Sequence, residues 1–523
     1  MSATEKPVTH RRLAGMLCPL FSIRSASDWG VGELPDFTRF APLLERAGMR
    51  VLMTLPLLEP SPGQESPYSP ISAFALDPLY ISIDEIPEME ALGGRTALST
   101  EDRGWLRAAR GASAVRHDIV RPLKKRWLER CFARFGEEAS SERRADLARF
   151  KEAHAHWLSD YALFRCLKEH YPQSWRAWPE ALRSKAPEAV EEARRAHAEE
   201  IAFYEFVQWI AFRQLEEARA SLRSLGISLG GDEPFLVAED SADVWGNQDL
   251  YRFDATVGAP PDAFSATGQD WGLPPYRWDR IAADDFALFR RRGEHAARLF
   301  DLVRIDHVVG LYRTYHRPID GAEPYFVPGV EPAQRAQGEA VLAAFAEAGA
   351  ALIAEDLGVI PDFVRHSLAQ LGIPGFRVLR WEERDGRFRP PEEWPALSVA
   401  TNGTHDTETT AVWWEALPDH QRAAIREIPG LADVPEDLAV SYNHHVHRAL
   451  LETLLASPSH LALLPVQDVF GLRERINTPN TVGPQNWSWR LPWSLHTMDR
   501  EDHVAGALDD LASLARRTNR LGR

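Results

Sequence analysis

Acidic side chains end several short apolar stretches of the chain. In the stretch LVRIDHVVG, Arg304 and Asp306 lie two residues apart, so the period of a β-strand directs both side chains to the same side. A buried strand rarely carries such a pair, because burial of charge is costly unless the two groups hold each other or take part in a reaction. We predict that Asp306 is a catalytic nucleophile that Arg304 keeps ionised. An ion pair that only stabilises the core is the alternative.

Two further stretches end in acids in the same way. The run ALIAEDLG carries Glu355 and Asp356, and the run SVATNGTHD ends in Asp406. Asp306 and Glu355 on neighbouring parallel strands, which lie ~4.8 Å apart, would hold their carboxyl groups about 5 to 5.5 Å apart, as a retaining glycosidase pair does. Repulsion between them would raise the pKa of the less solvated one, so we predict that Glu355 is the proton donor.

Asp406 is then the third acid. It would accept hydrogen bonds from sugar hydroxyls and distort the sugar ring towards the transition state. His307 and His405 stand beside these acids as neutral hydrogen-bond donors. Each residue alone also has a purely structural interpretation. Asp356 or Asp406 could cap a helix, and His405 could satisfy a backbone carbonyl.

The elements that would position these residues alternate along the chain. Eight apolar runs are bounded by Gly, Pro, Asp or Asn: 15–22, 50–57, 227–237, 302–310, 351–358, 375–381, 398–406 and 461–469. Most are separated by segments of helical period, at 35–47, 212–225, 286–300, 332–348 and 440–455. Eight alternating strands and helices predict a (β/α)8 TIM barrel in one catalytic domain, 1–523, with reacting groups at the C-terminal strand ends. A doubly wound open sheet is the alternative.

Long connections interrupt this pattern twice. Residues 58–226 separate the second and third runs and include an Ala/Arg/Glu-rich region, 98–195, so we predict an inserted, mainly helical subdomain. Residues 239–280 are rich in Gly, Pro, Asp and aromatic residues, and we expect a loop insertion on the barrel rim. After the eighth run we expect a loop, one helix over 501–517 and no C-terminal β-sandwich.

Composition narrows the class of partner. A net charge of −16 argues against nucleic acid, while seventeen Trp residues, several beside polar, Gly or Pro positions, suit stacking on sugars. Three widely spaced cysteines indicate reduced thiols, and we predict a cytoplasmic protein without a signal peptide or a membrane span. The oligomeric state stays open.

We expect no cofactor and no metal. The histidines of NHHVHRAL, at positions 444, 445 and 447, have no carboxylate at matching helical spacing, so a polar helix face is the better interpretation. Gly230 to Asp232 lack the lysine of a phosphate-binding loop.

Seven motifs add a resemblance to a known family. They are SPYSPISAFALDPLYI, GDEPFLVAEDSADVW, PPDAFSATGQDWGLPPYRW, RIDHVVG, IAEDLGVIP, GTHDTET and NWSWR. In this order, from about Ser66 to Arg490, they resemble the amylomaltases, which are the 4-α-glucanotransferases or disproportionating enzymes of glycoside hydrolase family 77. The resemblance implies a TIM barrel with rim insertions.

The resemblance also implies roles for individual residues. Asp306 would be the nucleophile, Glu355 the acid/base and Asp406 the transition-state stabiliser. Glucan contacts would come from Tyr68, Asp232, Gln269, Trp271, Arg304, His307 and His405. The expected partners are α-1,4-glucans as donors, with another glucan or glucose as acceptor. An α-amylase-like hydrolase and a catalytically silent glucan-binding protein are the alternatives.

Overall fold

The computed structural model describes residues 7–261, 267–384, 387–479 and 481–522. Eight parallel strands close into a barrel in the order β1-β14-β13-β10-β9-β6-β3-β2. The strands are β1 (Leu13–Leu17), β2 (Val51–Met53), β3 (Ser228–Glu233), β6 (Leu302–Ile305), β9 (Ala351–Ala354), β10 (Gly375–Val378), β13 (Ser398–Thr401) and β14 (Leu461–Pro465). Each lies in or overlaps one of the eight predicted runs. The predicted TIM barrel is confirmed, and the open sheet is excluded because β1 pairs with both β14 and β2.

Alternate residues of the strands have different neighbours, as the pleat requires. Ten buried side chains form a small apolar cluster of their own that fills the barrel interior: Leu13, Val51, Met53, Leu302, Ile353, Phe376, Val378, Val399, Leu461 and Leu463. Their sequence neighbours, such as Ala14, Leu52 and Val303, belong to the large outer cluster, which packs against the surrounding helices.

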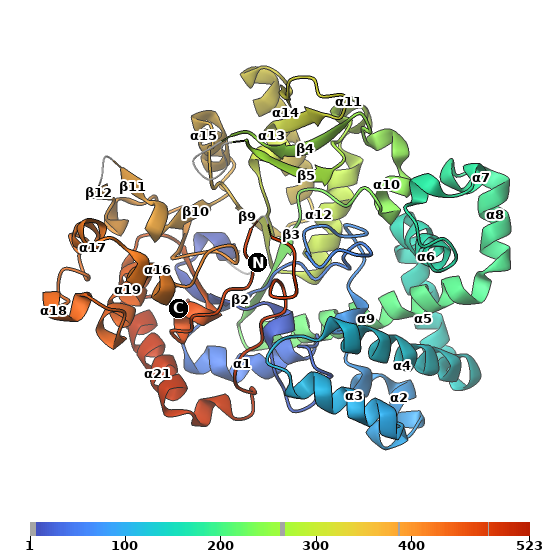
Figure 1. The fold of residues 1–523 in the computed structure, drawn as a ribbon, viewed down its shortest axis with the longest axis horizontal. Coiled ribbons are helices and arrows are strands. Elements are labelled where there is room, and N and C mark those ends of the chain that lie inside the picture. Colours follow the sequence, from blue (N-terminus) through green and yellow to red (C-terminus); the bar gives the residue numbers. More distant parts are fainter. Residues whose placement is uncertain (1–6, 262–266, 385–386, 480, 523) are drawn as a thin grey trace, which may run out of the picture.

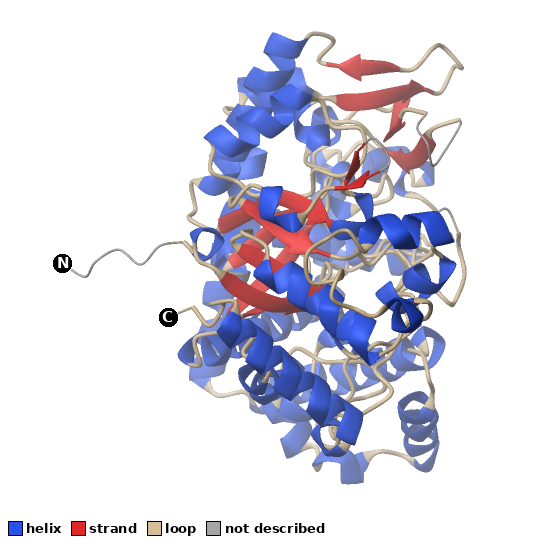
Figure 2. Ribbon diagram, turned by 90° about the vertical axis from the view of Figure 1, so that its left-hand side faces the viewer, coloured by secondary structure: helices blue, strands red, loops and turns tan. Residues whose placement is uncertain are grey.

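Helices cover the outside of the barrel (Figures 1 and 2). Those on the connections between strands, and after β14, include α1 (Asp36–Arg46), α9 (Ala198–Ser224), α12 (Ala287–Leu299), α14 (Glu331–Ala346), α15 (Asp362–Gln370), α19 (His444–Ala456) and α21 (Asp502–Arg517). The connection from β10 to β13 differs, since its described residues form only a two-stranded hairpin, β11 (Glu383–Arg384) and β12 (Arg387–Phe388), and short 3-10 turns.

Most of the inserted helices lie between β2 and β3. They are α2 (Pro87–Ala91), α3 (Thr100–Gly111), α4 (His117–Glu138), α5 (Ser141–Ala153), α6 (Ala155–His170), α7 (Glu180–Arg183) and α8 (Pro187–Ala196). In Figure 1 they gather with α9 to the right of the barrel and below it. The region from 98 to 195 is helical, as its periodicity indicates. Its status as a separate subdomain stays a prediction.

The connection from β3 to β6 corrects one expectation. Instead of only loop, it contains β4 (Ala255–Ala259) and β5 (Gln269–Leu273), which join β7 (Thr314–Pro318) and β8 (Tyr325–Val327) in a four-stranded antiparallel sheet. This sheet lies at one end of the barrel region, at the top in Figures 1 and 2. The sequence does not indicate these strands because no residue of β5 is fully buried and the β4–β5 register shifts at Val257/Gly258. Its pairing also depends on β7, which follows β6.

After β14 the described residues form α20 (Val466–Val469), a long irregular segment and α21. None of the helices that the structure describes is long and apolar enough to cross a membrane.

Candidate functional site

Asp306 and Glu355 lie at the ends of adjacent strands. In the β6–β9 pair, Ile305 is the register partner of Ala354, and the two acids follow directly. The backbone N–H of Glu355 donates to the carbonyl of Ile305 at 3.0 Å, and that of Asp306 donates to the carbonyl of Glu233 at 3.0 Å. Three neighbouring strands therefore fix the backbone of both acids at the C-terminal end of the barrel, where the active sites of TIM-barrel enzymes lie.

Arg304 forms ion pairs with two acidic side chains at the C-terminal end of the barrel. Its guanidinium lies 2.9 Å from Asp306 Oδ1 and donates to Asp232 at 2.7 Å. Burial alone would lower the pKa of Arg304, but Asp232 and Asp306 raise it, so the guanidinium stays charged. Asp232 is buried and only 24% of the Asp306 side chain is exposed. The pair predicted from the spacing of Arg304 and Asp306 exists, with Asp232 as an additional partner.

Glu355 is held by backbone groups. Its Oε2 accepts from the N–H of His307 at 2.9 Å, and its Oε1 accepts from the N–H of Leu357 at 3.0 Å. Burial, and after it the negative charge of Asp306, raise the pKa of Glu355 to about 7 against the opposing effect of Arg304. The predicted direction is confirmed, although burial contributes more than the repulsion between carboxylates. A carboxyl group with this pKa can give and take a proton near neutral pH.

His307 adopts a left-handed backbone with φ of 42°, a strained conformation for a residue with a side chain and typical of functional sites. This turn directs its N–H to Glu355. Its ring meets the ring of Trp271 edge to face, with centroids 4.7 Å apart, and burial lowers the pKa of His307 to about 4. The imidazole is therefore neutral near pH 7. Trp271 Nε1 donates to Gln269 Oε1 at 3.0 Å within β5.

Tyr68 connects this group to the loop after β13. Its hydroxyl donates to Asp232 Oδ2 at 2.7 Å and lies 3.4 Å from His405 Nδ1. The rings of Tyr68 and His405 stack with centroids 5.0 Å apart. Because His405 Nε2 lies 3.4 Å from Asp406 Oδ2, a continuous chain of contacts runs from Asp306 through Arg304, Asp232, Tyr68 and His405 to Asp406.

Asp406 is held in its ionised form. Asn477 Nδ2 donates to its Oδ1 at 2.6 Å. Burial would raise the pKa of Asp406, but His405, Asn477 and Arg304 together lower it to about 2. Asp406 also raises the pKa of His405, for which burial acts in the opposite direction. Since 43% of the Asp406 side chain remains exposed, its carboxylate is accessible to a ligand.

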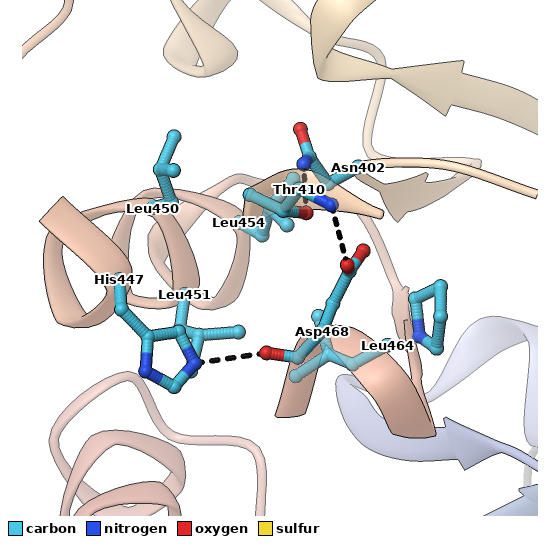
Figure 3. Close-up of a pocket in the computed structure, with 9 residues that line it drawn as sticks. Asn402, Thr410, His447, Leu450, Leu451, Leu454, Leu464 and Asp468 are labelled. Atoms are coloured by element: carbon cyan, nitrogen blue, oxygen red, sulfur yellow. Dashed lines mark hydrogen bonds between the residues drawn. The ribbon is translucent and has the colours of Figure 1, made fainter. Parts of the chain in front are cut away.

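A network of hydrogen bonds holds the two ends of the loop 402–409. Thr410, at the start of α16 (Thr410–Ala416), donates its N–H to Asp468 Oδ1 at 2.7 Å, and Asn402 bonds the Thr410 hydroxyl. His447 Nε2 donates to the carbonyl of Asp468 at 2.8 Å. Figure 3 shows these residues around a small pocket, with His447 and leucines of α19 on one side and Asn402, Thr410 and Asp468 on the other. The hydrogen bonds around this pocket hold both ends of the loop 402–409 in place. Arg380 also donates to the Asn402 carbonyl at 2.6 Å.

Neither acid caps a helix, so this structural interpretation of Asp356 and Asp406 is wrong. Asp356 does not cap a helix, because α15 begins only at Asp362. Instead, Asp356 accepts from the N–H of Phe376 at 2.6 Å and from Arg377 at 3.3 Å, and so holds β10 in place. Asp406 does not cap α16, whose N-cap residue is Thr409.

Reasoning from the sequence missed two contributors to the site. Asn477 begins the stretch NTPNT, but its contact with Asp406 could not be predicted, because it lies in a loop and its partner is distant in the chain. Trp487 belongs to the NWSWR motif, and its ring lies 5.7 Å from that of Tyr68 and 5.6 Å from that of His405. Residues 262–266 of the motif PPDAFSATGQDWGLPPYRW lie outside the described residues.

Comparison with known proteins agrees with this arrangement. The family model described as 4-alpha-glucanotransferase matches residues 18–496. The chain belongs to this family. As a member it is an enzyme of the transferase class. The 4-alpha-glucanotransferase of Thermus thermophilus is 37% identical over 485 residues, which cover 88% of this chain and 92% of that protein. The one from Chlamydia pneumoniae is 31% identical, with 92% of each chain covered.

Solved structures of the 4-alpha-glucanotransferase family extend the likeness to the fold. The amylomaltase of Streptococcus agalactiae in complex with acarbose superposes with a TM-score of 0.83 at 26% identity. The match covers 98% of this chain and all of that one. Sequence and fold thus place the chain in the same family.

Proposed function

We propose that this protein transfers α-1,4-glucan segments to the 4-hydroxyl of another glucan or of glucose by a retaining double displacement. The observation that carries the proposal is the pairing of Asp306 with Arg304 beside a partly buried Glu355 whose pKa is about 7. One carboxylate is bound to a cation and its neighbour is poised to hold a proton. Two carboxyl groups on adjacent strands, ~4.8 Å apart at the backbone, suit a retaining reaction, whereas an inverting one needs room for a water between them.

In the first step, Asp306 attacks the anomeric carbon of the donor glucan. Protonated Glu355 gives its proton to the leaving glycosidic oxygen, and the C1–O bond breaks as the bond from C1 to the Asp306 carboxylate forms. The product is a covalent β-glucosyl enzyme. Ionised Asp406 accepts hydrogen bonds from sugar hydroxyls, which stabilises the positive charge that develops on the sugar ring.

In the second step, the 4-hydroxyl of the acceptor replaces the leaving chain. Glu355, now ionised, takes the hydroxyl proton while the oxygen attacks C1, and the bond to Asp306 breaks with retention of the α configuration. No group other than side chains of this protein is needed to balance the reaction.

Binding of the glucan would use the surrounding polar and aromatic groups. We propose that Tyr68, Asp232, Arg304, His307 and His405 bind or orient the sugar at the reacting bond. Gln269 and Trp271, on the half-buried strand β5, would hold the acceptor so that it reaches the intermediate before water does. Aromatic rings stack on the CH faces of sugars while amides bond their hydroxyls. We place the enzyme in the cytoplasm because its three cysteines are free and buried.

Product analysis separates this proposal from its alternatives. Incubation with maltotriose yields glucose together with longer oligomers if the enzyme transfers, and only glucose and maltose if it hydrolyses. A catalytically silent glucan-binding protein yields no products. Replacement of Asp306 by Ala should lower product formation by several orders of magnitude, as removal of a covalent nucleophile does. Equal product formation by the D306A variant would refute the mechanism.

A further inference from the structure

A cluster of metal-ligating side chains lies in the inserted helical region between β2 and β3, and it contains no residue of the candidate site. Cys166 and His170 stand at positions i and i+4 in the last turn of α6, so they share one face of that helix. His197 is the N-cap residue of α9, and Glu200 lies in its first turn. Helices α6 and α9 pack against each other, and this contact brings the two pairs together.

The four potential ligand atoms lie close together. One ligand atom from each residue lies within 4.8 Å of all the others, and no other group of this kind occurs in the part of the chain that the structure describes. Cys166 Sγ donates to Glu200 Oε2 at 3.5 Å, and His170 Nε2 lies 2.9 Å from the same oxygen. His197 Nδ1 lies 3.0 Å from Glu200 Oε1, and the two imidazole rings are 4.3 Å apart.

We propose that Cys166, His170, His197 and Glu200 bind a divalent transition metal of the zinc type. A tetrahedral Zn²⁺ site has bonds of about 2.3 Å to sulfur and about 2.0–2.2 Å to nitrogen or oxygen. Those lengths place neighbouring ligand atoms about 3.3 to 3.6 Å apart. The contacts of Cys166, His170 and His197 with the Glu200 carboxylate, at 2.9 to 3.5 Å, lie near these values. The whole set of ligand atoms lies within 4.8 Å, so binding would draw the outer ligand atoms closer together by side-chain rotation.

The ligand types also select this class of metal. A thiolate and two imidazoles favour Zn²⁺ and related ions over Mg²⁺ or Ca²⁺, which prefer oxygen ligands. One thiolate and one carboxylate balance the charge of a divalent cation. Burial raises the pKa of Cys166 to about 12, so the thiol is protonated without metal. On binding, the S–H bond breaks, the S–metal bond forms and the proton leaves to solvent.

Ion pairing alone explains only part of the cluster. Two histidines beside Glu200 would account for their contacts with its two oxygens. Cys166 adds only a long, weak S–H···O hydrogen bond to this carboxylate, so ion pairing does not explain why a thiol lies here. Cys166 is fully buried beneath the cluster, while 42% of the His170 side chain and 46% of the Glu200 side chain are exposed. The thiol thus forms the floor of a site that opens to solvent, which gives an ion a path to enter.

The position of the cluster suggests a structural role. The metal would tie the C-terminal end of α6 to the N-terminal end of α9, a helix that packs against the barrel through β3. Neither ligand pair is specific alone, and the two pairs lie on different helices. This is why no metal site was predicted from the sequence.

Cobalt substitution tests the site on the full-length protein. The protein is stripped with a chelator, and Co²⁺ is then added as the spectroscopic probe. We expect one equivalent to bind, with the visible bands of a tetrahedral ion and the near-ultraviolet charge-transfer band of a thiolate ligand. Addition of one equivalent of Zn²⁺ should displace Co²⁺, remove both signals and raise the thermal midpoint of the apoprotein.

Two variants locate the ligands and one serves as a matched control. Cys166→Ser should lose the charge-transfer band, and His197→Gln, at a partly exposed position, should weaken Zn²⁺ binding more than about 100-fold, since loss of an outer-shell partner already costs up to about that factor. Cys131→Ser replaces another buried thiol, on α4, and should keep the complete spectrum. Failure to bind one equivalent of Co²⁺, Co²⁺ bound without a thiolate band, or a thiolate band that survives Cys166→Ser would each overturn the proposal.

Discussion

The guanidinium of Arg304 lies 2.9 Å from Asp306 Oδ1 while it also donates to both carboxylate oxygens of Asp232 at 2.7 Å. A single buried cation thus positions the proposed nucleophile and anchors it to the neighbouring strand β3. The planar fork of a guanidinium can contact two partners in fixed directions, which an ammonium cannot reproduce.

Replacement of Arg304 by Lys should therefore lower kcat by about 10²- to 10³-fold, the range for loss of a positioned electrostatic group. The reason is that a lysine keeps the positive charge but cannot contact Asp232 and Asp306 at the same time, so one of the two carboxylates loses its partner. Steady-state kinetics with maltotriose measures the effect. Arg46→Lys, which changes a pair of exposed residues, Arg46 and Asp509, should leave kcat unchanged. A similar loss in both variants would contradict the assignment.

The pKa of Glu355 predicts a pH profile. Because burial raises this pKa to about 7 and the first step needs the protonated acid, kcat/KM should fall as the pH rises through about 7. The apparent value belongs to the coupled Asp306–Glu355 pair, and kcat/KM reports the free enzyme. With a glucosyl fluoride donor, whose leaving group needs no proton, this decline should disappear. A decline of equal size with both donors would assign it to another group.

Asn477 is a positioning residue for Asp406, with its Nδ2 2.6 Å from Oδ1. Loss of this donor in Asn477→Ala should lower kcat about 10-fold with a smaller change in KM, because the carboxylate is oriented less well in the transition state. Asn477→Asp should be worse, since a second negative charge repels Asp406. Equal activity of the two variants would mean that Asn477 only fills space.

Trp271 is the proposed acceptor platform, and its edge-to-face contact with His307 places it beside the reacting groups. Trp271→Ala should shift products from longer oligomers towards free glucose and maltose, because water competes better when the acceptor is held poorly. A contact between two aromatic rings is worth about 0.5–1.5 kcal/mol, and a sugar–Trp271 contact of the same size would make the ratio of transfer to hydrolysis fall roughly 2- to 10-fold. Trp271→Phe retains an aromatic ring, so its ratio of transfer to hydrolysis should lie between those of the wild type and Trp271→Ala. An unchanged ratio in Trp271→Ala would remove this role.

Local patterns predicted much of the barrel and part of the site. Strand period places Arg304 and Asp306 on one side, and strand adjacency places Glu355 next to Asp306, so both follow from short stretches of sequence. The sheet that contains Trp271 could not be predicted, because β4 pairs with β7 across the intervening barrel strand β6. The contact of Asn477 with Asp406 likewise joins two loops that only the closed barrel brings together.

The account depends most on a covalent bond between the sugar and Asp306. The Glu355→Gln variant keeps the nucleophile but lacks the base for the second step, and α-maltotriosyl fluoride needs no acid for the first. The glycosyl enzyme should then accumulate and be seen by mass spectrometry of the digested protein. We predict one maltotriosyl group on the peptide that contains Asp306, and none in the D306N/E355Q double variant. A label on a different residue, or fluoride release at the wild-type rate without any label, would contradict the mechanism.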